Sequence, residues 1–454
     1  MVYSFKKQTI HDVLNLALPA VGEMTLYMMI WVLDTIMVGQ YGGNIGVSSV
    51  GISSEILYTF VNIFIAVGIS ISITSLVARK FGAKKITEAE EYATLGLFIG
   101  TIVSFIIFLF CFIFSKNILI IAGAKNEVIK LSNIYMKIAS IAIFFNMLTN
   151  LLNGILRGYG NTKTPLFISA IINIVNLTLD YLLIFGIGFF PELGVKGAAI
   201  ATLIAEITGF IFASSYMLKN SKIKIKFKYI KLLNKKRLLD LIKLSIPSSM
   251  QEGAFDICKL INTFMIMHIG SISFAANQIT TSIESLSFMP GWGFAIAATT
   301  LVGHKIGEKN YKKAQEYAHT CAFLGTSIML LCGIMFLIFP NFLISLFIQT
   351  TEKEVIKLGS LCVMIASVEQ PAMALSMIYG GALKGMGDTR TPFIISVISN
   401  WIIRLPLIYY VIYIAKLPVH YVWWVTAIQW GFDGLLMVKL FKIKFKRIYP
   451  NNTI

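Results

Sequence analysis

The sequence predicts an all-α membrane protein with twelve transmembrane helices, arranged as two homologous six-helix lobes. Three observations support this fold class: the composition is apolar, the apolar residues fall into long segments, and the two halves repeat each other. The chain has 454 residues, of which 56% are hydrophobic and 13% are charged. A soluble domain typically has about 25% charged residues. This chain has too little polar surface for a soluble globule, and we expect lipid to surround it.

The cysteines and the net charge exclude several other classes of protein. The five cysteines lie in apolar stretches without paired spacing, so they indicate neither a disulfide framework nor a metal site. A formal net charge of +17 would suggest nucleic-acid binding in a soluble protein. Here the distribution of the charge indicates membrane topology instead. The first apolar segment is too long for a cleavable signal peptide and carries Glu23 and Asp34.

Twelve segments are long and apolar enough to cross a bilayer, which takes about 20 mostly apolar residues in a helix. Strands of a membrane β-barrel would alternate apolar and polar residues, and these segments do not alternate. We therefore predict helices over residues 13–38, 48–78, 90–115, 131–156, 164–189, 194–218, 240–268, 273–303, 316–340, 356–383, 391–414 and 418–440.

The basic residues assign the orientation of these helices. Most of the 39 lysines and arginines precede the first helix or follow an even-numbered helix. Cytoplasmic loops carry such an excess of positive charge, so both termini are expected in the cytoplasm and the protein in the inner (plasma) membrane. We predict an N-lobe over residues 1–218, a basic linker over 219–239 and a C-lobe over 240–454. The linker is interpreted as a solvated segment at the anionic inner leaflet.

An internal duplication relates the two lobes. Six helices per repeat is an even number, so both halves enter the membrane from the same side. In transporters of this kind, the two parallel repeats are related by an axis along the membrane normal, and the substrate binds between the halves. The matching blocks occur in the same order in each half: Leu16–Pro19 with Leu244–Pro247, residues 76–82 with 301–307, and residues 156–165 with 383–392.

Acidic residues inside predicted spans are candidates for function, because a charged side chain at the bilayer centre costs roughly 2.5–3.5 kcal/mol on insertion scales. Asp34 lies deep in the first span and Asp180 in the fifth. Asn176 shares a helical face with Asp180, since residues four apart are neighbours on a helix. Two carboxylates and an amide form an oxygen-rich pocket that suits Na⁺, and paired carboxylates can also hold a proton. A static hydrogen-bond network between packed helices is the alternative.

Several motifs together resemble the multidrug and toxic compound extrusion (MATE) family. They are Pro19 in the first span and the segments Asp34–Gly39, Val77–Ala83, Leu156–Thr162 and Lys384–Pro392. The resemblance covers nearly the whole chain, and it implies a V-shaped pair of lobes that exports cationic or amphiphilic compounds in exchange for Na⁺ or H⁺. It also implies a cation site at Asp34, Asn176, Asp180 and Thr202. Pro19 corresponds to a family proline that is associated with bending of the first helix.

The second half does not duplicate this pocket, since Asn262 replaces Asp34 in the repeat. The seventh span instead carries Glu252, Asp256 and Lys259 on one helical face, and we expect Lys259 to pair with Asp256 or Glu252. These charges either line a cavity for cationic substrate or form an ion pair that fixes helix packing. Glu284 is another candidate for a substrate cavity. Thioethers and aromatic rings can also attract cations, and the further candidates of this kind are Met28, Met265, Met289 and Trp292.

The sequence thus predicts a secondary active antiporter, without cofactor or nucleic-acid partner, that acts as a monomer among membrane lipids. Either Na⁺ or H⁺ could drive it. One alternative is a lipid-linked oligosaccharide flippase of the same superfamily, although these usually have about fourteen helices. A second alternative, an integral-membrane transferase, has no supporting cluster of catalytic side chains. We therefore expect a transporter and no enzyme.

Overall fold

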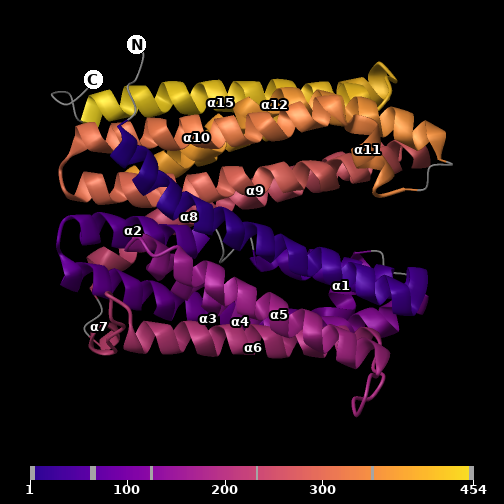
Figure 1. Cartoon of the computed structure of the whole chain (residues 1–454), viewed down its shortest axis with the longest axis horizontal. Helices are drawn as coiled ribbons and strands as arrows, with labels where there is room; N and C mark the ends of the chain where they lie inside the picture. Colours follow the sequence, from indigo (N-terminus) through magenta and orange to yellow (C-terminus); the bar gives the residue numbers. More distant parts are fainter. Residues whose placement is uncertain (1–5, 62–67, 123–125, 232–233, 349–351, 449–454) are drawn as a thin grey trace. The chain divides into compact units, whose positions relative to one another are not determined.

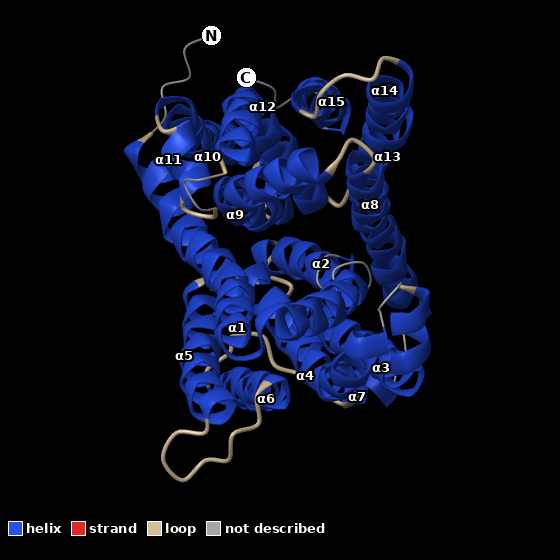
Figure 2. Cartoon of the chain, turned by 90° about the vertical axis from the view of Figure 1, so that its right-hand side faces the viewer, coloured by secondary structure: helices blue, strands red, loops and turns tan. Residues whose placement is uncertain are grey.

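The computed structural model describes residues 6–61, 68–122, 126–231, 234–348 and 352–448, and these residues form helices and loops without any strand (Figures 1 and 2). The helices of the first part are α1 (Lys7–Val61), α2 (Ser70–Gly82), α3 (Ile86–Ile121), α4 (Asn126–Gly158), α5 (Lys163–Phe185), α6 (Val195–Lys219) and α7 (Lys228–Lys231). Those of the second part are α8 (Lys235–Met267), α9 (Ser271–Gly307), α10 (Tyr311–Ile338), α11 (Pro340–Ser345), α12 (Lys353–Met386), α13 (Arg390–Val397), α14 (Leu405–Tyr409) and α15 (His420–Ile448), with π-helical turns η2 (Ile398–Arg404) and η3 (Tyr410–Ile414) between α13 and α15.

Many of these helices are apolar over a bilayer-spanning length, as the sequence predicts. Within the described residues, nine are long and apolar enough to cross a membrane. The expected spans 48–78, 240–268 and 418–440 are not among the nine. The first of these includes residues 62–67, which lie outside the described residues, and the second carries Glu252, Asp256 and Lys259. The protein is a multi-pass membrane protein, and the number of twelve spans stays a prediction.

The chain forms two compact units, and each contains its own helix bundle. Unit 2 comprises Gly22–Ser249. Its central helix is α4, which packs against α2, α3 and α6, while α5 packs mainly on α6. Large apolar side chains of α4, including Met147, Leu151 and Ile155, are fully buried. Van der Waals packing of this kind is a main source of helix association in lipid.

Unit 1 comprises Met1–Val21 and Met250–Ile454. Its central helix is α12, which packs against α9, α10 and α15 (Figure 1). The predicted lobe boundaries thus differ from the compact units at both ends. Residues before Gly22 belong with the second half, and residues 240–249 belong with the first. In each case the chain changes unit two residues after a proline inside a helix, Pro19 in α1 and Pro247 in α8.

The helix α1 contains the first expected segment, 13–38, and the first part of the second, 48–61. A straight helix would place Ile30 and Leu57 about 40 Å apart, at 1.5 Å per residue. Both side chains line the same cavity, so α1 cannot be straight and its direction must reverse between them. Within unit 2, the parts of α1 around Ile30 and around Leu57 therefore pack as separate helical arms.

The internal duplication is visible in matching hydrogen bonds. The Thr74 hydroxyl of α2 donates to the Gly154 carbonyl of α4 at 2.9 Å. In the second half the Thr299 hydroxyl donates to the Gly381 carbonyl at 2.9 Å. Each bond satisfies a threonine hydroxyl inside a tight helix crossing, which small residues permit in a membrane protein.

A second matched hydrogen bond is kept in both halves, although its donor and acceptor residues occupy swapped positions in the repeat. The Ser115 hydroxyl donates to Asn133 Oδ1 at 2.6 Å in unit 2. In unit 1 the Ser360 hydroxyl donates to Asn341 Oδ1 at 2.7 Å. The serine and the asparagine have changed places between the repeats, so sequence comparison of the halves misses a contact that the fold retains.

We expect Gly381→Ala to destabilise the protein, because a Cβ at this position would lie 2.4 Å from the Ala295 carbonyl oxygen. Overpacking of a tight core typically costs about 1–3 kcal/mol of unfolding free energy. The neighbouring Gly380→Ala is a matched control, since its Cβ would meet only the Met437 side chain at 3.8 Å. Thermal unfolding in detergent should show a lower midpoint for Gly381→Ala alone. Equal midpoints for the two variants would contradict this packing.

The linker is less solvated than the sequence suggests. Ile223 and Tyr229 are buried, and the Lys224 and Lys226 backbone amides donate to Glu90 and to the Thr94 hydroxyl of α3 at 3.4 and 3.2 Å. The described part of residues 219–239 is therefore docked on α3. The predicted solvated linker therefore keeps most of its lysines exposed while its other side packs on α3, which the alternation of lysine and isoleucine allows.

Candidate functional site

The structure brings the predicted cation-site residues together in unit 2. Asp34 comes from α1, Asn176 and Asp180 come from one face of α5, and Thr202 comes from α6. Asp34, Asn176 and Asp180 are 4%, 1% and 0% exposed. Helix α1 and the consecutive helices α5 and α6 thus contribute polar side chains to one buried point.

The hydrogen bonds among these residues are long. Asn176 Nδ2 donates to Thr202 Oγ1 at 3.5 Å, and Thr202 Oγ1 lies 3.4 Å from Asp34 Oδ2. The same hydroxyl donates to the Ala198 carbonyl at 2.9 Å. A hydroxyl has a single proton to donate, and the shorter contact is the better bond. Asp34 therefore receives little stabilisation from Thr202.

The carboxyl groups of Asp34 and Asp180 lie within hydrogen-bonding range of each other. Ionised carboxylates only accept hydrogen bonds, so the pair needs a proton or a cation between them. Asp34 Oδ1 and both carboxyl oxygens of Asp180 lack hydrogen-bond partners, and so does Asn176 Oδ1. No described lysine or arginine forms an ion pair with either aspartate. These free oxygens match the ligands that a hard cation prefers.

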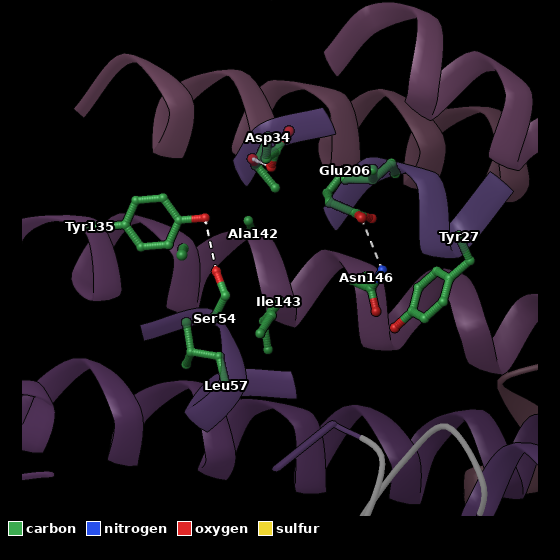
Figure 3. Close-up of a pocket in the computed structure, with 12 residues that line it drawn as sticks. Tyr27, Asp34, Ser54, Leu57, Tyr135, Ala142, Ile143, Asn146 and Glu206 are labelled. Carbon is green, nitrogen blue, oxygen red and sulfur yellow. Dashed lines mark hydrogen bonds between the residues drawn. The ribbon is translucent and has the colours of Figure 1, made fainter. Parts of the chain in front are cut away.

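A cavity opens beside Asp34 (Figure 3). Its volume is about 40 Å³, and a water molecule needs roughly 10–15 Å³ on the same measure. Water can therefore occupy it next to the carboxyl pair. Its lining residues come from α1, α4 and α6: Tyr27, Ile30, Asp34, Ser54, Leu57, Tyr135, Ala139, Ala142, Ile143, Asn146, Thr202 and Glu206.

Glu206 is a cavity residue to which the sequence alone assigned no role. It lies four residues after Thr202 on α6, so both face the same side of the helix. That spacing is readable in the sequence. The role of Glu206 depends on the contacts of α6 with α1 and α4, which a single sequence does not reveal.

Pro19 lies inside α1, before the cavity residues, and is half-buried. Proline removes a backbone donor from the helix and weakens the local ladder of hydrogen bonds. Its repeat partner Pro247 occupies the corresponding place in α8.

Two charged residues of α8 have basic or acidic neighbours on other helices. Glu252 interacts with the buried Lys384 of α12. Lys259 is exposed, and its charge acts on Glu284 of α9. Of the two acids predicted as partners for Lys259, Glu252 thus has a different basic neighbour, Lys384, and pairing of Lys259 with Asp256 stays a prediction. Asp256 is half-buried on the same helix.

The remaining substrate-cavity candidates are half-buried and do not line the cavity at Asp34. Glu284 and Glu369 are close neighbours in unit 1, with Arg404 acting on both. Trp292 packs against Phe288, with their ring centroids 6.4 Å apart. Met28 belongs to unit 2, and Met265 and Met289 belong to unit 1.

Comparisons with known proteins agree with the duplicated fold. The MatE family model matches this chain twice, over residues 19–182 and 247–410. A probable multidrug resistance protein NorM of Thermotoga maritima is 29% identical over 399 residues, which cover 87% of this chain and 84% of the relative. An uncharacterized transporter YisQ of Bacillus subtilis is 27% identical and covers 87% of this chain and 86% of the relative.

Solved structures show the same fold. An outward-facing multidrug resistance MATE family transporter of the MOP superfamily superposes with a TM-score of 0.90 at 20% identity, covering 97% of each chain. A MOP superfamily transporter from Pyrococcus furiosus gives a TM-score of 0.88 at 19% identity, covering 97% of this chain and 96% of the other. With two family matches in tandem and this fold, the chain belongs to the MatE family of membrane transporters.

Proposed function

We propose that the protein is a secondary active multidrug efflux antiporter, which exports cationic or amphiphilic compounds in exchange for Na⁺ or H⁺. The names of its relatives support multidrug efflux, since the Thermotoga maritima relative is a probable multidrug resistance protein. The observation that carries the proposal is the buried carboxyl pair of Asp34 and Asp180 beside a water-sized cavity.

The electrostatics of this pair explain why a cation would bind. Two like charges 4 Å apart repel by roughly 4 kcal/mol in a medium of protein-like dielectric. Neither aspartate has a basic partner among the described residues, so a bound Na⁺ or proton supplies the missing positive charge. Hydrogen-bond acceptors that lack donors, on Asp180 and Asn176, can then coordinate Na⁺.

Cation occupancy can drive transport only through different affinities in different conformations. The carboxyl pair joins α1 to α5. Its repulsion when empty and its attraction around a cation give α1 two preferred positions. Pro19 weakens α1 before this point, so the helix can bend there as the pair gains or loses its cation.

The second half supplies the proposed substrate surface. Glu284, Met289 and Trp292 lie on α9, and Met265 lies on α8. A carboxylate, thioethers and an aromatic ring attract organic cations without strict geometry. Glu252 and Glu284 both have basic neighbours, Lys384 for the first and Arg404 and Lys259 for the second.

Transport by the purified protein in liposomes tests the proposal. A fluorescent organic cation is the substrate, and the proton and sodium gradients are set separately while membrane potential is clamped. We expect at least one of the two ion gradients to drive the dye against its own concentration gradient, because occupancy of the carboxyl pair couples the two fluxes. Dye movement that ignores both gradients would contradict the antiport mechanism. Flipping of a lipid-linked oligosaccharide without dye transport would favour the flippase instead.

A further inference from the structure

Glu206 is the second carboxyl group of the cavity at Asp34. It is 6% exposed, and Figure 3 shows its side chain directed toward Asn146 of α4. The other titratable groups that line the cavity are Asp34, Tyr27 and Tyr135. The cavity thus holds an acidic group at a position separate from the Asp34–Asp180 pair.

The hydrogen bonds of Glu206 leave half of its carboxyl group unsatisfied. Oε1 accepts a hydrogen bond from Asn146 Nδ2 at 2.9 Å, while Oε2 is buried without a partner. Asn146 Oδ1 already accepts from Asn150 Nδ2 at 3.0 Å, which fixes the amide with its donor toward Glu206. A buried charged group with so little compensation is costly, so this carboxyl group requires a cation or a proton.

Other buried glutamates of unit 2 show how the fold treats acids with a structural role. Glu23 has Arg157 at 3.5 Å, and Glu90 has Lys226 as an ion-pair partner. Among the described residues, Glu206 forms no ion pair, although it lines a cavity large enough for water. The positive charge it needs must come from solution.

We propose that Glu206 and Asn146 form a second cation subsite, so that the cavity takes up two monovalent cations in each transport cycle. The proposal rests on the antiport function given above and deepens it. Na⁺ at this subsite would be bound by the Glu206 carboxylate and by water in the cavity, and a proton would be held on Oε2. Both ions satisfy the same chemical requirement, a single positive charge at a buried carboxylate.

The number of cations exchanged per substrate distinguishes one site from two. In liposomes with the membrane potential clamped at zero, substrate accumulates at equilibrium in proportion to the cation gradient raised to that number. A tenfold gradient then supports ~100-fold accumulation with two cations and ~10-fold with one. Imposing the sodium and proton gradients separately identifies the ion.

Glu206→Gln removes the charge and preserves the oxygen that accepts from Asn146. We expect this variant to transport, with the exponent of the cation gradient, which is the number of cations exchanged per substrate, lowered from two to one. The exposed Glu192→Gln, in the loop between α5 and α6, is the matched control and should keep an exponent of two. Size-exclusion profiles verify folding of each variant.

A wild-type exponent of one would overturn the proposal without any variant. So would an exponent of two that Glu206→Gln leaves unchanged. Failure of the antiport function itself gives a different result, because neither the wild-type protein nor any variant would then accumulate substrate under either gradient.

Discussion

Asp180→Asn is expected to reduce gradient-driven export to the level of protein-free liposomes. Asparagine has nearly the same shape, so the packing of α5 should survive. The variant removes one of the two charges that hold the cation, and with it the difference in affinity between conformations. Dye accumulation under the driving gradient measures the effect, with expression and folding checked by size-exclusion chromatography.

Asp34→Asn should produce the same loss, because the two carboxyl groups hold one cation together. The double variant should be no worse than either single variant, since coupled residues are not additive. Asp433→Asn is a matched control: Asp433 is also a buried aspartate, 4% exposed, but it lies on α15 in unit 1 and accepts from Gln429 Nε2 at 3.2 Å. Wild-type export by Asp180→Asn, or equal loss in Asp433→Asn, would refute the coupling role.

The sequence is informative where function depends on local spacing. The i, i+4 spacing of Asn176 and Asp180 predicts that they share a face, and the structure places both at Asp34. The duplication is also readable, because matching motifs recur in order and the family matches fall on the same two halves. Both features need only periodicity and a comparison of the chain with itself.

Features that depend on tertiary neighbours are not readable in the same way. Glu252 of α8 interacts electrostatically with Lys384 in the last turn of α12, and no spacing within α8 indicates that. The meaning of Glu206 similarly requires Asn146 on another helix. Docking of the linker depends on Glu90 and Thr94 of α3. A charge pattern shows which residues need partners, and only the fold identifies them.

Arg157→Met is expected to destabilise unit 2 by about 3–5 kcal/mol, the usual cost of removing one partner from a buried ion pair. Arg157 is 8% exposed and Glu23 is 2% exposed, and the guanidinium lies 3.5 Å from the Glu23 carboxylate. Asn153 Nδ2 also donates to Glu23 Oε1 at 3.2 Å. Without the arginine, Glu23 would retain a single amide donor. The free energy of unfolding in detergent, from denaturant titration, measures the loss.

The same ion pair fixes α1 just after its proline. Glu23 follows Pro19 by four residues, and Arg157 belongs to α4 at the centre of unit 2. Replacing both partners, as Glu23→Gln with Arg157→Met, should restore most of the stability because no charge is then buried alone. In the second half, Lys384→Met should likewise destabilise through Glu252, its electrostatic partner on α8. If the double variant is no more stable than Arg157→Met, the loss comes from packing of the arginine side chain, and the ion pair does not anchor the segment after Pro19.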